Sequence, residues 1–240
     1  LPAVRAVAAQ DLPVSAMNPL IRLHPADDVL IARAQLVSGA AHGGLTVRGL
    51  VPPVEFLASG EGIDQTLWGG LSAAEIEQVN CGERLLSRRE IKTLQALYDA
   101  EIQYMDRCLG RLLESLENTG VLSRSLVVIT ADCGMLLGEG EYLGTGLDLS
   151  PPALHVPLIV RHPGEKLGRR FSEPVSLAQV KSLLLRELGV THRPGPGEYV
   201  FDPKLDQLLV AEWTPSTQIP ASCRDQWPQQ LKAVIRGQRM

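Results

Sequence analysis

The sequence predicts a mixed α/β fold with a mainly parallel sheet flanked by helices, and three observations support this prediction. Residues 126–130 are five consecutive apolar or β-branched residues without polar alternation, the pattern of a strand covered on both faces. A long amphipathic helix feeds directly into that strand, as in half of a βαβ unit. A second short apolar strand is expected at 157–161. The 240 residues therefore read as a single α/β domain.

Composition limits the classes of partner. The hydrophobic content of 45% and the charged content of 21% are ordinary for a globular protein. A net charge of −4 gives no argument for nucleic acid or membrane partners. No run approaches the roughly 18 apolar residues of a membrane span. The four cysteines form no CxxC pair, so no zinc site of that type is expected, and the sequence does not indicate a cellular compartment.

The first third of the chain carries weaker signals. Residues 28–38 predict a helix, because Asp27 and Asp28 precede an apolar run and would complement the dipole of a helix that begins there. A short strand is expected at 45–50. Residues 54–86 show no clear period, so we expect them to be irregular.

The clearest helix begins at Ser87, which forms a predicted capping box with Glu90. Gly120 ends it in the way that a left-handed C-cap would. Between them, apolar residues recur at three- and four-residue steps and form one stripe. Its members are Ile91, Leu94, Tyr98, Ile102, Met105, Leu109, Leu112 and Leu116.

The second half alternates loops with short elements. The glycine-rich stretch 134–146 is expected to be a loop. Ser176 opens another capped helix, which runs to Leu188 and ends at Gly189. A proline-rich surface loop is expected at 191–203. The tail, 191–240, carries two candidate edge strands at 208–211 and 232–236.

Asp132 is the candidate site residue that the pattern itself indicates. It stands where the strand 126–131 ends, before Cys133 and Gly134. In open α/β sheets, ligands bind outside the carboxyl ends of such strands, so a metal ligand or a catalytic acid is expected there. The alternative is that Asp132 only caps a turn, which is a common role for aspartate.

The order of motifs resembles the sulfatase family of the alkaline phosphatase superfamily. In that family a helix of the form Y-x-A-x-I-x-x-x-D-x-x-x-G precedes a strand that ends in S-D-H-G or S-D-N-G. The segments L-G-E-H, R-V-P-L-I-V and V-S-x-V-D follow. The matching segments here span 85–190 in the same order, at Tyr98–Gly110, Ala131–Gly134, Leu137–Glu139, Val156–Val160 and Val175–Gln179.

This resemblance implies an alkaline-phosphatase-like layer architecture and a sulfuric-ester hydrolase acting on a sulfate ester. Family members use a nucleophile in a C-x-P-S-R or S-x-P-S-R segment, matured to formylglycine. They also hold a divalent metal, calcium or a similar ion. Asp132 matches a metal-binding aspartate, and Cys133 occupies the position of the adjacent histidine or asparagine, so both are candidate metal ligands. A metal and cationic side chains suit an anionic transition state.

The chain departs from the family at several site positions. A thiol at Cys133 suits zinc better than calcium. Gly140 replaces the histidine of L-G-E-H, and His155 replaces the arginine of R-V-P-L. No Lys, Arg or His occurs between Cys133 and His155, and no segment resembles C-x-P-S-R. We therefore expect a degenerate site without catalytic residues, a metal that is weakly held or lost, and impaired or absent hydrolysis.

Two other functions remain open. The first is a non-catalytic pseudo-sulfatase that serves as a binding or assembly module. The second is an unrelated metal-dependent phosphoesterase that uses Asp132 and Cys133. Because no segment resembles C-x-P-S-R, the match also predicts a chain without the nucleophile half of the domain. The family's central sheet draws strands from both halves, so an upstream segment or a protein partner would complete the sheet.

Overall fold

The structure, a computed structural model, describes residues 19–26, 29–36, 52–57, 63–165, 167–171, 174–190, 208–214, 219, 223–228 and 230–236. The chain divides into two compact units. Unit 1 comprises Leu1–Ser125 and Leu136–Thr145, and unit 2 comprises Leu126–Met135 and Gly146–Met240. The single domain that the sequence predicts stays a prediction.

Unit 1 begins with an antiparallel pair, β1 (Pro19–Ala26) and β2 (Val29–Leu36), in which Ala26 lies opposite Val29. The helix predicted over 28–38 is therefore wrong. Its apolar residues include β-branched Val29 and Ile31, which favour strands, and two residues between two apolar runs suit a hairpin connection better than a helix start. The strand predicted at 45–50 lies outside the described residues.

Helix α1 (Ala73–Asn80) lies within the stretch predicted to be irregular. Its N-cap is Ser72, whose hydroxyl accepts a hydrogen bond from the Glu75 amide at 3.3 Å, while the Glu75 carboxylate accepts one from the Ser72 amide at 2.8 Å. This capping box is present in the sequence. The helix was missed because it has only eight residues, too few for a clear apolar period.

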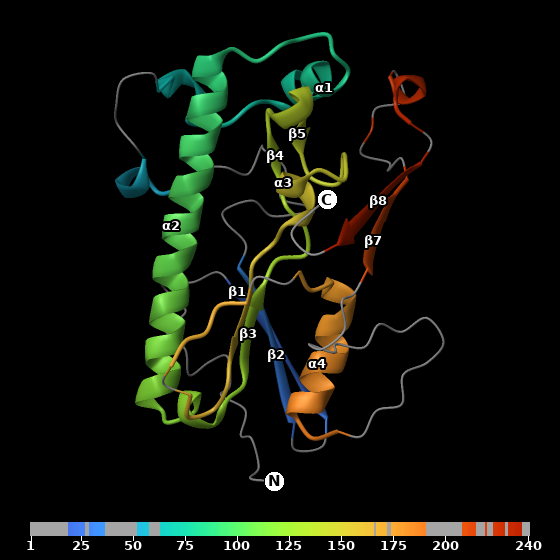
Figure 1. The fold of residues 1–240 in the computed structure, drawn as a ribbon. Helices are drawn as coiled ribbons and strands as arrows, with labels where there is room; N and C mark the ends of the chain where they lie inside the picture. Colours follow the sequence, from blue (N-terminus) through green and yellow to red (C-terminus); the bar gives the residue numbers. More distant parts are fainter. Residues whose placement is uncertain are drawn as a thin grey trace. The chain divides into compact units, whose positions relative to one another are not determined.

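Helix α2 (Arg88–Asn118) is the long helix in Figure 1, and its 31 residues span about 46 Å. The Ser87–Glu90 capping box and the left-handed Gly120 (φ 70°) are confirmed. The predicted apolar stripe is only partly correct, because Ile102 and Met105 are 42% and 44% exposed. Small residues, which the apolar count overlooked, lie on the buried face, which comprises Thr93, Leu94, Leu97, Ala100, Glu101 and Cys108.

A short hairpin completes unit 1, formed by β4 (Leu136–Leu137) and β5 (Leu143–Gly144). The sequence predicts only a loop here. Leu136 and Leu143 are 0% and 1% exposed, since β4 packs on α2 and β5 packs on α1. The hairpin is thus part of the core of unit 1.

Unit 2 contains the two strands expected from their apolar runs, β3 (Val127–Thr130) and β6 (Leu158–Arg161). They pair antiparallel, with Val127 opposite Arg161. The mainly parallel sheet is not confirmed, since every strand pair among the described residues is antiparallel. An apolar run indicates coverage of a strand on both faces but carries no information on the direction of its neighbour.

The remaining elements of unit 2 are short. Helix α3 spans Pro151–Leu154 and helix α4 spans Val180–Glu187. The capping box of Ser176 and the left-handed Gly189 (φ 68°) are confirmed. The predicted tail strands are also confirmed, as the antiparallel hairpin of β7 (Leu208–Trp213) and β8 (Leu231–Arg236) (Figure 1). No helix among the described residues is long and apolar enough to cross a membrane.

Short 3-10 helices connect these elements. They span Val54–Phe56, Gln65–Leu67, Leu122–Arg124, Glu139–Glu141, Leu177–Gln179 and Arg224–Gln226. In unit 2, the indole of Trp213 donates a hydrogen bond to the Gly146 carbonyl at 2.7 Å, and its ring lies 6.0 Å from that of Trp227. These contacts attach the β7 end to the segment that leads into α3.

Candidate functional site

Asp132 and Cys133 follow the carboxyl end of β3, as the sequence predicts. Both side chains are exposed. The Cys133 thiol donates to Asp132 Oδ1 at 3.5 Å, so one oxygen and one sulfur donor lie side by side on adjacent residues. The two residues lie side by side as neighbours in the chain, and their role as metal ligands stays a prediction.

Gly134 fixes this turn against α3. Its amide donates to the Ala153 carbonyl at 2.9 Å. A Cβ atom built at this position would lie 1.8 Å from the Pro152 carbonyl oxygen, closer than Cβ atoms approach backbone in proteins. Only glycine fits here without a shift of the backbone. Because Gly134 directly follows Cys133, its hydrogen bond to Ala153 holds the two candidate ligands next to α3.

Local hydrogen bonds to a side chain stabilise the segment before α3. Asp148 Oδ1 accepts hydrogen bonds from the amide of Ser150 at 3.1 Å and from its hydroxyl at 2.8 Å. His155 follows α3 with an exposed side chain, and its amide donates to the Pro151 carbonyl at 2.8 Å. These contacts give Asp148 and the His155 backbone structural roles.

The donor set does not fit a calcium site. Within the described part of the chain, no group of three or more His, Cys, Asp or Glu residues could hold a metal ion. Calcium takes six to eight oxygen ligands, whereas Asp132 and Cys133 offer one carboxylate and one thiol. The resident divalent metal that the resemblance implies therefore has no complete set of ligands among these residues.

The hairpin that carries Leu137 to Gly140 has a backbone that favours glycine. Gly138 (φ 113°) and Gly140 (φ 62°) both lie in the left-handed region. Glu139 Oε2 accepts a hydrogen bond from the Leu137 amide at 2.5 Å, so its carboxylate holds the turn. The position at which the family pattern has histidine, Gly140, is thus a conformation that L-residues rarely adopt.

Asn80, the last residue of α1, holds the other strand of this hairpin. Its side-chain amide donates to the Leu143 carbonyl at 3.0 Å and accepts from the Leu143 amide at 2.8 Å. These two bonds replace ladder hydrogen bonds that a neighbouring strand would supply. No local pattern predicts this contact, because the two residues lie 63 positions apart.

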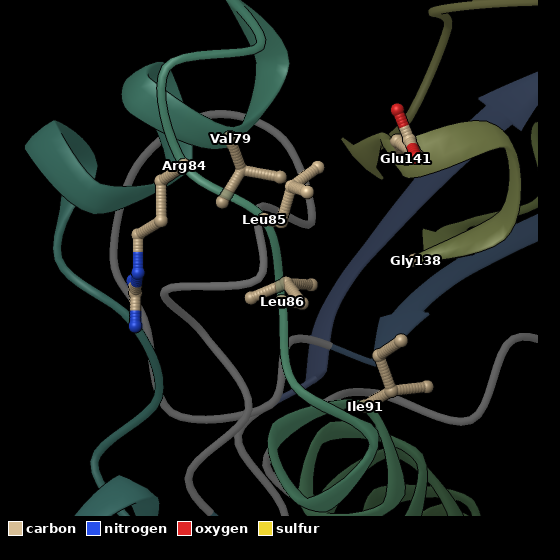
Figure 2. A pocket seen from close by; sticks show the side chains of 7 residues that line it. All are labelled: Val79, Arg84, Leu85, Leu86, Ile91, Gly138 and Glu141. Atoms are coloured by element: carbon tan, nitrogen blue, oxygen red, sulfur yellow. The ribbon is translucent and has the colours of Figure 1, made fainter.

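A pocket of about 180 Å³ lies between this hairpin and the segment that joins α1 to α2 (Figure 2). Its aliphatic walls come from both helices and from their connection. The sequence analysis did not predict it, although the capping boxes at Ser72 and Ser87 mark the starts of α1 and α2 and could have located both helices. Its lining residues are Val79, Arg84, Leu85, Leu86, Ile91, Gly138 and Glu141.

Arg84 forms ion pairs with two carboxylates. Its guanidinium lies 3.3 Å from Glu75 Oε1 and also pairs with Glu90 Oε1. Hydrogen bonds from Ser72 and the nearby Arg84 charge lower the pKa of Glu75. For Glu90, burial raises the pKa, but hydrogen bonds from Ser87 and the charge of Arg84 outweigh it, so the pKa lies below its ordinary value.

Asp27 and Asp28 lie outside the described residues. Two further polar residues make their contacts away from the turn at Asp132. His162 Nδ1 lies 3.5 Å from Glu187 Oε2, which is a contact to α4. Arg224 donates to the Ile219 carbonyl at 3.0 Å, a structural role near the C-terminal tail.

Comparisons with known proteins place these features in a family. The sulfatase family profile matches residues 61–190, more than half of the chain. Arylsulfatase K of Danio rerio is 29% identical over 131 residues, which are 55% of this chain and 25% of that protein. An arylsulfatase of Clostridium perfringens is 25% identical over 52% of this chain and 28% of its own length. The chain thus spans about a quarter of the length of these relatives.

A solved structure gives the same result at the level of fold. A phosphonate monoester hydrolase from Silicibacter pomeroyi superposes with a TM-score of 0.54 and 23% identity, covering 62% of this chain and 32% of that one. At this identity the likeness concerns the fold alone. It supports an alkaline-phosphatase-like architecture for the matched part.

Proposed function

Because this chain belongs to the sulfatase family, we propose that it is a sulfatase-like protein with impaired sulfuric-ester hydrolase activity. The observation that carries the proposal is the backbone of Gly140, whose φ of 62° suits glycine where the family pattern has histidine. A histidine at this position would adopt a left-handed conformation, as the adjacent Glu141 does (φ 68°), at a steric cost that glycine avoids.

The charge of the matched segment supports the same proposal. Residues 134–154 contain no Lys, Arg or His. Transfer of a sulfuryl group passes through an anionic transition state, which enzymes stabilise with fixed positive charge. In this segment Glu139 and Asp148 accept hydrogen bonds from nearby backbone amides, and no side chain of the segment supplies positive charge to the transition state.

We extend the proposal to the metal, which is held weakly or is lost. A bound divalent cation would supply positive charge at the reacting oxygens. Asp132 stays in place for such an ion, but the thiol of Cys133 is a poor ligand for calcium. Both side chains are exposed, so water competes for any ion at the strand end.

An aryl sulfate ester assay together with thermal unfolding tests this proposal. The full chain and Asp132→Ala are each measured with Ca²⁺, Mg²⁺, Mn²⁺ and Zn²⁺. A metal at about a hundred times its dissociation constant stabilises a fold by about 2.7 kcal/mol. We expect slow turnover at most and no ion-specific rise in Tm. Turnover as fast as that of an active arylsulfatase assayed in parallel would overturn the proposal, and an ion-specific rise that Asp132→Ala removes would overturn its metal part.

A reversion variant tests the observation on the hairpin. Gly140→His places a Cβ atom in the left-handed region, which costs about 1–2 kcal/mol of stability. Gly69→His is the matched control, because Gly69 has no positive φ and nothing within 4 Å of its Cβ position. Urea unfolding should show a loss for Gly140→His alone. If both variants are equally stable, the backbone does not exclude histidine and the argument fails.

A second candidate function is a non-catalytic binding or assembly module. The observation in its favour is the pair β3 and β6, in which no side chain is buried and Ile159 is 56% exposed. An apolar ribbon of this kind suits a further strand or a protein face, supplied by an upstream segment or a partner. Residual sulfate ester turnover that Asp132→Ala abolishes would favour the impaired hydrolase over the purely non-catalytic module.

A further inference from the structure

The pocket beside the hairpin of unit 1 has a composition that the proposed function does not use. We propose that it binds a small alkylammonium ion, whose ammonium group pairs with the Glu141 carboxylate while its alkyl chain packs on Leu85, Leu86 and Ile91. The inference is independent of the sulfatase reaction. It rests on the pocket's walls, charge, backbone and size.

The wall formed by the α1–α2 connection is aliphatic and partly open. In Figure 2, the side chains of Leu85 and Leu86 extend from the connection toward the hairpin loop that carries Gly138 and Glu141. Val79 of α1 is only 2% exposed, whereas Leu85 is 69% exposed. An alkyl chain lying against Leu85 would remove apolar surface from water, which favours binding.

Arg84 and Glu141 are the two charged residues that line the pocket. The Arg84 guanidinium points away from the hairpin in Figure 2, toward its carboxylate partners Glu75 and Glu90. Among the described residues, no Lys, Arg or His forms an ion pair with Glu141. Because Arg84 already pairs with Glu75 and Glu90, Glu141 is the charged lining residue that a cationic ligand can pair with.

The backbone of Glu141 is a separate observation that points to its side chain. It has a φ of 68° and is the only non-glycine residue with positive φ in the described part of the chain. Glycine occupies such conformations without steric cost, and glycines lie nearby at Gly138 and Gly140. A glutamate held at a strained position beside a pocket is typical of a residue kept for what its side chain binds.

The size of the pocket limits the ligand. Sites for drug-sized molecules occupy about 300–1,000 Å³, whereas this pocket measures about 180 Å³. It therefore accommodates an amine of about the size of a lysine side chain and excludes large ring systems. A four-carbon amine such as n-butylammonium is a suitable probe.

The test is a titration of the ¹⁵N-labelled full chain, followed by amide chemical shifts. The probes are n-butylammonium, 1-butanol and butyrate, which share an alkyl chain and differ in charge. We expect saturable shifts at Leu85, Ile91 and Gly138 with the ammonium, and several-fold weaker binding of the other two. Equal affinity for 1-butanol, or shifts that miss the pocket, would overturn the proposal.

Variants of Glu141 make the test sharper. Because Glu141 is exposed, Glu141→Gln should weaken n-butylammonium binding about two- to five-fold. Glu141→Gly should weaken it equally while raising Tm by about 1–3 °C, since it relieves the left-handed strain. Glu117→Gln, the same change of charge near the far end of α2, is the control and should leave binding unchanged.

The two readouts of Glu141→Gly are expected to move in opposite directions. A gain in stability with a loss of binding is the signature of a side chain kept for a ligand. A gain in stability with unchanged binding would mean that the carboxylate does not recognise the amine, and the proposal would be wrong. If Glu141→Gln fails to fold, Glu141→Gly still decides the question.

Discussion

The pairs β4–β5 and β3–β6 contrast in a way that their sequences do not suggest. Each strand of β4–β5 has two residues, yet Leu136, Leu137 and Leu143 are 0%, 6% and 1% exposed. Each strand of β3–β6 has four residues and a longer apolar run, yet none of its side chains is buried. The burial of a strand thus depends on what packs against it, and the length of its apolar run is a poor guide.

The difference has a visible structural cause. Helices α1 and α2 both contact the β4–β5 hairpin, and the Asn80 side chain completes its hydrogen bonds. For β3–β6, the apolar run indicates a strand meant to be covered on both faces, and Ile159 is nevertheless 56% exposed. The β3–β6 pair therefore has apolar side chains that other elements cover only in part.

Matched alanine variants of the two pairs provide the strongest test of this comparison. Leu136→Ala should lower the free energy of unfolding by about 2–5 kcal/mol, because it leaves a cavity in the core. Ile159→Ala removes a half-exposed side chain and should cost less than about 1 kcal/mol. Urea unfolding of both variants measures the difference. Equal losses would mean that β3–β6 is covered as fully as β4–β5 and would remove the contrast.

A second test concerns the turn at the end of β3. The backbone packs tightly at this turn, although no side chain of β3 itself is buried. Gly134→Ala brings a Cβ atom within 1.8 Å of the Pro152 carbonyl oxygen and should cost about 2–3 kcal/mol. The control is Gly110→Ala in α2, whose Cβ position has nothing within 4 Å and which should gain about 0.5–1 kcal/mol. Thermal unfolding should therefore shift in opposite directions. A neutral Gly134→Ala would show that the turn adjusts easily.

Local patterns in the sequence predicted the elements that depend on local chemistry. The capping boxes at Ser87 and Ser176 and the glycine stop at Gly120 are confirmed, because they depend on residues within a few positions. The helix predicted over 28–38 failed for the opposite reason. Its partner strand, β1, decided its conformation, and a short apolar run fits either structure.

The candidate site was predictable to a similar extent. The position of Asp132 and Cys133 after β3 follows from the apolar run and the glycine after it. The close approach of Gly134 to Pro152, the contact of Asn80 with Leu143 and the pocket all depend on residues distant in sequence. No pattern of neighbouring residues carries that information, so only the structure reveals these features.

The smallest expected effect concerns the charged residues of unit 1 around the α1–α2 connection. The α1–α2 connection carries Arg84 between Glu75 and Glu90, and the pKa of Glu90 lies below its ordinary value. A carboxyl whose pKa is lowered by folding stabilises the fold above its unfolded pKa, near 4.3, and loses this contribution as the pH falls through the lower, folded pKa. Stability of unit 1 should therefore decline in acid partly through Glu90.

Glu90→Gln isolates that contribution, because glutamine keeps the capping box with Ser87 and removes the charge. We expect a loss below about 1 kcal/mol at pH 7 and a smaller difference from the unmodified chain at acid pH, where both side chains are neutral. Urea unfolding at several pH values measures it, with Glu114→Gln on the exposed side of α2 as the control. A loss that stays constant across this range would mean that Glu90 acts by packing and hydrogen bonding alone. The charge of Glu90 would then contribute nothing to the stability of unit 1.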